Sequence, residues 1–63
     1  MTENADYKEA AEAAAEAEQN NRWKAAAELW MSAYFQARKE QNASWANSRS
    51  EYCIKRHKEA RHA

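Results

Sequence analysis

The feature that most constrains this fold is the complete absence of glycine and proline from its 63 residues. Proline interrupts helices and glycine weakens them. The chain is instead dominated by Ala, Glu, Lys, Arg and Gln, all of which favour helix. No segment shows the alternation of apolar and polar residues that is typical of a strand. The sequence therefore predicts an all-α fold.

Helix boundaries must be inferred from Asn and Ser, because these residues cap helices and Asn tolerates left-handed backbone angles. Thr2 or Asn4 is expected to cap a first helix, and the pair Asn20–Asn21 to form the turn after it. Asn42 and Ser44 are expected to end a second helix and begin a third. We predict a three-helix module, a helical hairpin plus a third helix, with helices at about residues 5–19, 22–40 and 45–61.

The charges around the first turn also fit a different arrangement. Glu16 and Glu18 lie near the C-terminus of the first predicted helix, and Arg22 and Lys24 begin the second. Each pair lies at the end of the helix dipole that disfavours its charge. In an uninterrupted helix over residues 5–40, Glu18 and Arg22 would instead pair at i, i+4. The sequence thus leaves two arrangements open, a hairpin and a long helix that dimerises.

Residues 21–37 are expected to form the central helix, because their apolar side chains recur at helical spacing. The aromatic residues predicted to form the structural core of the three helices are Tyr7, Trp23, Trp30, Trp45 and Tyr52. One neighbouring helix cannot cover all the apolar surface of the central helix, so part of it should face a partner or a second copy. The residues predicted for that contact are Leu29, Met31, Tyr34 and Phe35.

The composition limits how stable a single copy can be. A chain of this size buries only ~60% of the surface that it exposes when unfolded. Its hydrophobic fraction of 44% is mostly alanine, with one Leu, one Ile, one Phe and no Val. Small chains usually gain stability from a disulfide, a metal or self-association, and Cys53 alone cannot form an internal disulfide. We therefore expect a single domain over residues 1–63 that forms a homodimer.

The sequence also bears on location. It contains no apolar run long enough to cross a bilayer, and its first twenty residues are acidic, unlike those of a signal peptide. A single free cysteine agrees with a reducing compartment. We expect a cytoplasmic protein that does not contact the membrane.

The net charge of zero hides a gradient, since residues 1–21 carry −5, residues 22–42 carry +2 and residues 43–63 carry +3. Two interpretations remain open: the acidic first helix packs on the basic third helix, or the basic residues contact an anionic partner. The residues that would contact an anion are Arg49, Lys55, Arg56, Lys58 and Arg61. Because nucleic-acid-binding domains usually carry a strong positive charge, we do not expect direct nucleic-acid binding. A DNA-binding or nucleoid-associated regulator is the second hypothesis.

Catalysis and cofactor binding are not expected. The chain lacks a glycine-rich phosphate loop and a nucleophile elbow. Cys53 and His57 are spaced i, i+4 and could share a metal ion, but a structural zinc site needs four ligands and only His62 remains. We interpret Cys53 as a small buried residue and His57 as a surface residue, and predict neither enzyme activity nor a metal site.

Residues 21–56 carry a pattern that resembles a known family. Trp23 and Trp30 are separated by alanines, and Trp45 is followed by Arg49 and by the pair Tyr52–Cys53. This pattern resembles the ANR family, small bacterial negative regulators of AraC-type transcription activators. The resemblance implies an all-helical anti-activator that binds the activator directly and blocks its dimerisation or DNA engagement at virulence promoters. It also implies the histone-like nucleoid-structuring protein as a possible second partner.

Overall fold

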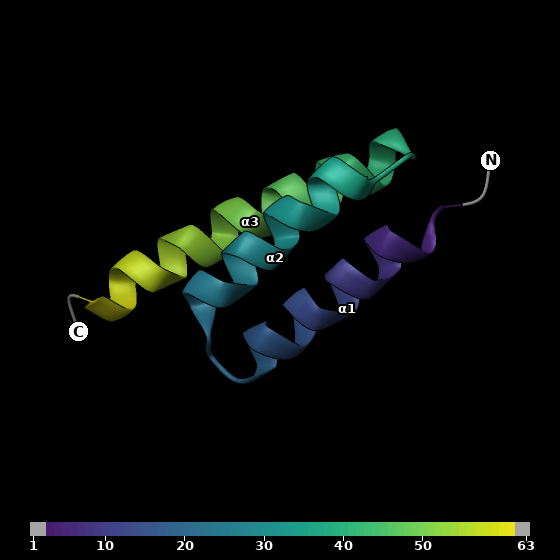
Figure 1. The fold of residues 1–63 in the computed structure, drawn as a ribbon. Helices are drawn as coiled ribbons and strands as arrows, with labels where there is room; N and C mark the ends of the chain where they lie inside the picture. The colour runs from purple at the N-terminus through teal and green to yellow at the C-terminus, as the bar shows by residue number, and fades with distance from the viewer. Residues whose placement is uncertain (1–2, 62–63) are drawn as a thin grey trace.

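The computed structural model describes residues 3–61 as three helices, α1 (Ala5–Gln19), α2 (Trp23–Gln36) and α3 (Glu40–Arg61). α2 packs against both α1 and α3 and runs antiparallel to each of them (Figure 1). The arrangement is elongated, with extents of 43 × 17 × 13 Å. No strand occurs within these residues, which confirms the predicted all-α, three-helix fold. In the same range, no helix is both long and apolar enough to cross a membrane.

The ends of α1 form as the local sequence predicts. The Asn4 side chain accepts a hydrogen bond from the backbone N–H of Tyr7 at 2.6 Å and so caps the helix. At the other end, Arg22 N–H donates to the Ala17 carbonyl at 2.9 Å, and Asn21 adopts a left-handed φ of 58°. These are the features of a Schellman turn, in which one left-handed residue ends the helix. The predicted break between the first two helices is confirmed.

The boundary between α2 and α3 differs from the prediction. We expected the second helix to reach about residue 40 and the third to begin at 45, whereas α2 ends at Gln36 and α3 begins at Glu40. Asn42 and Ser44 therefore lie inside α3 and do not separate two helices. Ala37 ends α2 by adopting extended backbone angles, with φ −66° and ψ 134°.

A carboxylate from the other end of the chain holds this connection. Glu3 accepts hydrogen bonds from the backbone N–H groups of Arg38, at 2.8 Å, and Lys39, at 3.2 Å. It also accepts one from the side-chain amide of Asn42 at 2.9 Å. Glu3 thus satisfies donors at the start of α3 that a local cap would otherwise satisfy. Because this partner is distant in sequence, local patterns could not locate the boundary.

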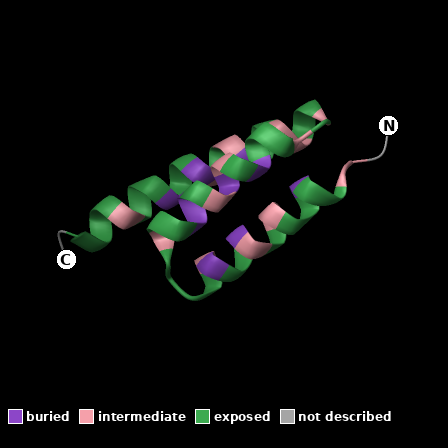
Figure 2. Ribbon diagram, viewed as in Figure 1, coloured by how far each residue is buried: buried purple, intermediate pink, exposed green. Residues whose placement is uncertain are grey.

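Small residues make up most of the interior, and Figure 2 shows the buried positions of the three helices in purple. The buried residues are Tyr7, Ala14, Ala17, Ala26, Ala27, Trp30, Ala33, Ala46, Ser50 and Cys53. Small side chains allow two helix backbones to approach closely. At the α2–α3 contact, the Ser50 hydroxyl donates a hydrogen bond to the Ala27 carbonyl at 3.0 Å. This bond both satisfies a buried hydroxyl and fixes the register of the two helices.

Two predicted core residues are not in the core. Trp45 is 54% exposed and Tyr52 is 41% exposed, so the prediction was wrong for both. α3 faces α2 through Ala46, Ser50 and Cys53, a stripe adjacent to the one that we predicted from its aromatic residues. The close contact between α2 and α3 requires small side chains, and the larger rings therefore lie at the edge of the contact.

Candidate protein-interaction surface

An apolar groove of about 260 Å³ lies between α2 and α3. Ala27 and Met31 line it from α2, and Ser50 and Ile54 line it from α3. Each pair is spaced i, i+4, so on both helices a small residue is followed one turn later by a larger one. The remaining lining residues are Lys24, Glu28 and His57. The groove is thus apolar along its floor and bordered by polar side chains.

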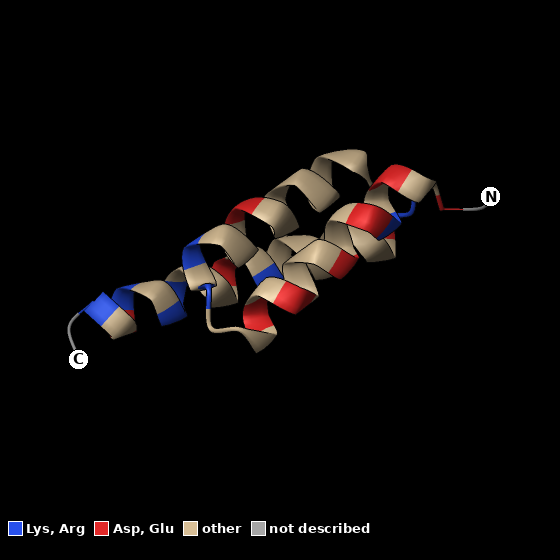
Figure 3. Ribbon diagram, turned by 60° about the horizontal axis from the view of Figure 1, so that its bottom comes forward, with Lys and Arg blue, Asp and Glu red and all other residues tan. Residues whose placement is uncertain are grey.

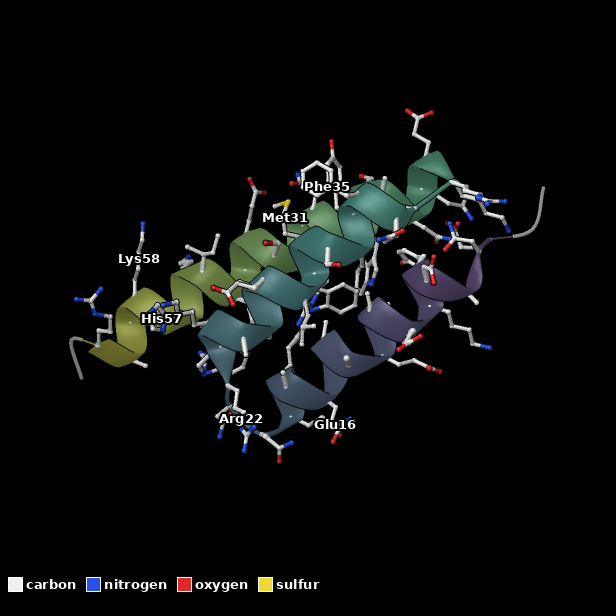
Figure 4. All side chains as sticks on the ribbon, viewed as in Figure 1. Glu16, Arg22, Met31, Phe35, His57 and Lys58 are labelled. Atoms are coloured by element: carbon white, nitrogen blue, oxygen red, sulfur yellow. The ribbon has the colours of Figure 1, made fainter. Side chains whose placement is uncertain are left out.

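Exposed apolar side chains continue from this groove along α2. Phe35 lies one turn beyond Met31 and is 76% exposed. Its ring packs edge to face against Tyr34, with 5.2 Å between ring centroids. Figure 4 shows Met31 and Phe35 on the side of α2 that is turned away from α1. We refer to Met31, Tyr34, Phe35 and Ile54 as the α2–α3 apolar surface.

The structure separates one predicted contact residue from the other three. Leu29 is half-buried, packs against the core and lines hollows between α1 and α2 together with Ala13. It therefore does not belong to the α2–α3 apolar surface. Ile54, which is 42% exposed, does belong to it but was not predicted. Ile54 follows Ser50 by four residues, so the two share a face of α3. This spacing predicts a groove residue only when the pairing of α3 with α2 is already known.

A second surface feature is a row of contacting arginine and aromatic side chains on α3 and the start of α2. The Arg49 guanidinium lies 5.6 Å from the ring centroid of Trp45 and 4.4 Å from that of Tyr52. Arg56 lies 5.0 Å from the centroid of Trp23, which makes an edge contact with Tyr52 at 6.0 Å. These cation–π contacts cover part of the half-buried or exposed rings. They explain how Trp45 and Tyr52 are accommodated outside the core, and they cover part of Trp23, which is half-buried and packs against the core.

Glu18 of α1 is the polar centre of the three-helix contact. Its carboxylate accepts hydrogen bonds from Trp30 Nε1 on α2 and from the Arg49 guanidinium on α3. Partial burial alone would raise the pKa of the Glu18 carboxyl, but the hydrogen bonds from Arg49 and Trp30 outweigh it and lower the pKa. Glu18 therefore stays ionised and links all three helices.

The predicted anion-contacting residues do not form one patch. Arg49 is paired with Glu18, and Arg56 lies over Trp23. The other three residues, Lys55, Lys58 and Arg61, are exposed. Their i, i+3 spacing places these three on one side of the C-terminal part of α3, apart from the paired Arg49. Figure 3 shows this basic end of α3 reaching past the rest of the described chain, away from most of the acidic residues of α1.

Cys53 and His57, the possible metal pair, lie in different environments. Cys53 is fully buried, whereas His57 lines the apolar groove. Burial and the nearby Glu18 carboxylate raise the pKa of the Cys53 thiol to about 11, so the thiol is protonated at neutral pH. Within residues 3–61 no three His, Cys, Asp or Glu side chains are placed to hold a metal ion. His62 lies outside the described residues.

Comparison of the chain with protein-family models, with curated proteins and with solved structures finds no match.

Proposed function

We propose that this chain is a protein-binding negative regulator, an anti-activator that binds an AraC-type transcription activator without contacting DNA. The observation that carries the proposal is the 76% exposure of Phe35 beside an apolar groove. Covering such a side chain with a partner surface contributes roughly 1.5–3 kcal/mol of binding free energy when burial is complete. The resemblance of residues 21–56 to the ANR family supplies the class of partner.

The proposed mechanism is occupancy. The α2–α3 apolar surface forms the centre of the interface, and Lys24 and Glu28 form part of its polar rim. This arrangement has the composition of many protein interfaces, an apolar centre with polar residues around it. The activator surface that becomes covered is the one needed for dimerisation or DNA engagement. Promoter binding is then lost without any chemical step, and the proposal requires a cytoplasmic location.

The proposal is tested by co-purification. Full-length AraC-type activators from the organism that encodes this chain are expressed with an affinity tag, each together with the untagged chain. We expect one activator to retain the wild-type chain and the Gln36→Ala control, but not Phe35→Ala. Both substituted residues are exposed on α2, so circular dichroism should show the same helix content for all three chains. Retention of Phe35→Ala at the wild-type level, or of no chain by any activator, would contradict the proposal. The same variants test the histone-like nucleoid-structuring protein.

One observation favours DNA binding through α3 as a second candidate function. Lys58 and Arg61 are exposed at the end of α3, and within residues 3–61 they form no ion pair. Phosphate contacts would make DNA affinity fall steeply with salt, and Arg56→Ala/Lys58→Ala would abolish binding. DNA affinity that is weak and unchanged by these substitutions would exclude this candidate.

A further inference from the structure

The turn between α1 and α2 depends on one residue in a left-handed conformation. Asn21 has φ 58°, the left-handed region that glycine occupies more readily than any other residue. Arg22, which precedes the first residue of α2, makes no side-chain capping hydrogen bond. The start of α2 therefore lacks the side-chain cap that Asn4 provides for α1.

The charges beside this turn favour its straightening. The last turn of α1 contains no basic residue, and the first turn of α2 contains no acidic residue. Glu16 and Glu18 instead lie near the negative end of the α1 dipole, and Lys24 lies near the positive end of the α2 dipole. In a single helix over residues 5–36 both dipole ends disappear from this region. No glycine or proline opposes such a helix.

α3 also extends beyond the start of α2 (Figure 1). The hydrogen bond from Ser50 to the Ala27 carbonyl fixes the antiparallel register of these two helices. If α2 continued straight into α1 at that register, Lys58 and Arg61 would lie beside residues 16–19, which contain Glu16 and Glu18. The basic end of α3 would then have the acidic helix beside it, which it lacks in the closed hairpin. This charge complementarity gives a reason for the gradient along the chain.

The contacts that α1 makes with α2 and α3 do not require the turn. α1 buries Tyr7, Ala14 and Ala17, and its Glu18 carboxylate binds Trp30 and Arg49. An α1 helix from another copy can make the same contacts. Two straightened chains that run antiparallel, with their turn regions side by side, place α1 of each on α2 of the other. Because the same side chains are buried in both arrangements, the apolar burial of α1 does not favour the closed form over the exchanged form.

We propose that this chain forms a domain-swapped homodimer in which α1 is exchanged between two copies. Residues 20–22 become helical, and Glu18 of each copy pairs with Arg49 of the other. Short connections under strain are known to favour such exchange. The proposal concerns the purified chain alone, so its failure is distinguishable from failure of the anti-activator proposal.

The first experiment measures mass in solution by size-exclusion chromatography with light scattering. Asn21→Ala disfavours the left-handed turn and should raise the dimer fraction, whereas Asn21→Gly relieves the turn and should yield monomer. Ser48→Ala, an exposed substitution in α3, is the control and should match the wild type. The same mass for Asn21→Ala and Asn21→Gly at every concentration would overturn the proposal.

The second experiment distinguishes exchange of α1 from dimerisation through the α2–α3 apolar surface. Glu18→Arg and Arg49→Glu each place like charges together in a closed monomer. In a mixture, α1 exchange restores both ion pairs, but only in a dimer of one chain of each kind. We expect the mixture to form that heterodimer and to melt at a higher temperature than either chain alone. A single chain that carries both Glu18→Arg and Arg49→Glu is the control, because it shows whether the ion pair forms when its two charges are exchanged. A mixture that behaves as the sum of its two components would overturn the proposal.

Discussion

Glu18 and Arg49 form an ion pair that joins α1 to α3, the two helices that contact each other least. The same Glu18 carboxylate accepts the indole N–H of Trp30 from α2. The apolar side of α1 is mostly alanine, so this polar contact adds to a small apolar burial in holding α1 in place.

Removing the carboxylate should therefore loosen α1. Glu18→Ala leaves the half-buried Arg49 and the buried Trp30 without their hydrogen-bond acceptor. Hydrogen bonds to charged groups contribute ~1.5–3 kcal/mol, and we expect the free energy of unfolding in urea to fall by about 2 kcal/mol. Glu16→Ala removes an exposed carboxylate on the same helix (Figure 4) and should change it by less than about 0.5 kcal/mol. Equal losses for the two variants would show that the Glu18 contact is not important.

Stability should also fall in acid through Glu3. Burial alone would raise the pKa of this carboxyl, but hydrogen bonds from the Asn42 side chain and from the backbone of Arg38 and Lys39 lower it to about 2 from 4.5. Between these two pH values the unfolded chain binds more protons than the folded chain, so stability is complete above pH 4.5 and is lost as the pH falls toward 2.

Urea unfolding at a series of pH values from 7 to 3 checks this prediction. Glu3→Gln should flatten the loss of stability in acid, because its side chain cannot titrate. Glu9→Gln, an exposed residue of α1 without these hydrogen bonds, is the control. If Glu3→Gln and the wild type lost stability in parallel, the Glu3 contacts would not form in solution.

Two tryptophans that pack against each other should differ in their contribution to stability. Trp30 is 5% exposed and Trp45 is 54% exposed, with 6.5 Å between their ring centroids. Trp30→Ala opens a cavity in the core and should cost ~3–5 kcal/mol, whereas Trp45→Ala should cost about 1 kcal/mol. Thermal unfolding followed by circular dichroism measures both. A larger loss for Trp45→Ala would contradict the arrangement of α2 and α3.

Local features of the fold were predictable from the sequence. The helix over residues 5–19 and the turn at Asn20–Asn21 are set by residues that adjoin them, and both were predicted. Asn4, which caps the helix, was one of the two capping residues that the sequence offered. The boundary between α2 and α3 was not, because Glu3 caps it from the far end of the chain. A pattern that covers a few turns of helix contains no information about such a partner.

The packing face of α3 shows a second limit. Large aromatic residues suggest a core position, so Trp45 and Tyr52 were predicted to be buried. The structure instead buries Ala46 and Cys53, because α2 approaches too closely for rings. The same packing decides the candidate surface, since it turns Leu29 toward α1 and leaves Phe35 exposed. Which apolar residues stay outside the core depends on how closely the helices pack together. The periodicity within one helix does not determine this.

The most direct test of the anti-activator proposal is the affinity of Phe35→Ala for the AraC-type activator that retains the wild-type chain. Titration of labelled wild-type, Phe35→Ala and Gln36→Ala chains with that activator gives the three values of Kd. The account predicts that Phe35→Ala raises Kd by about tenfold or more, a loss of at least ~1.4 kcal/mol, while Gln36→Ala leaves it within about twofold of the wild type. Equal values of Kd for wild type and Phe35→Ala would contradict it.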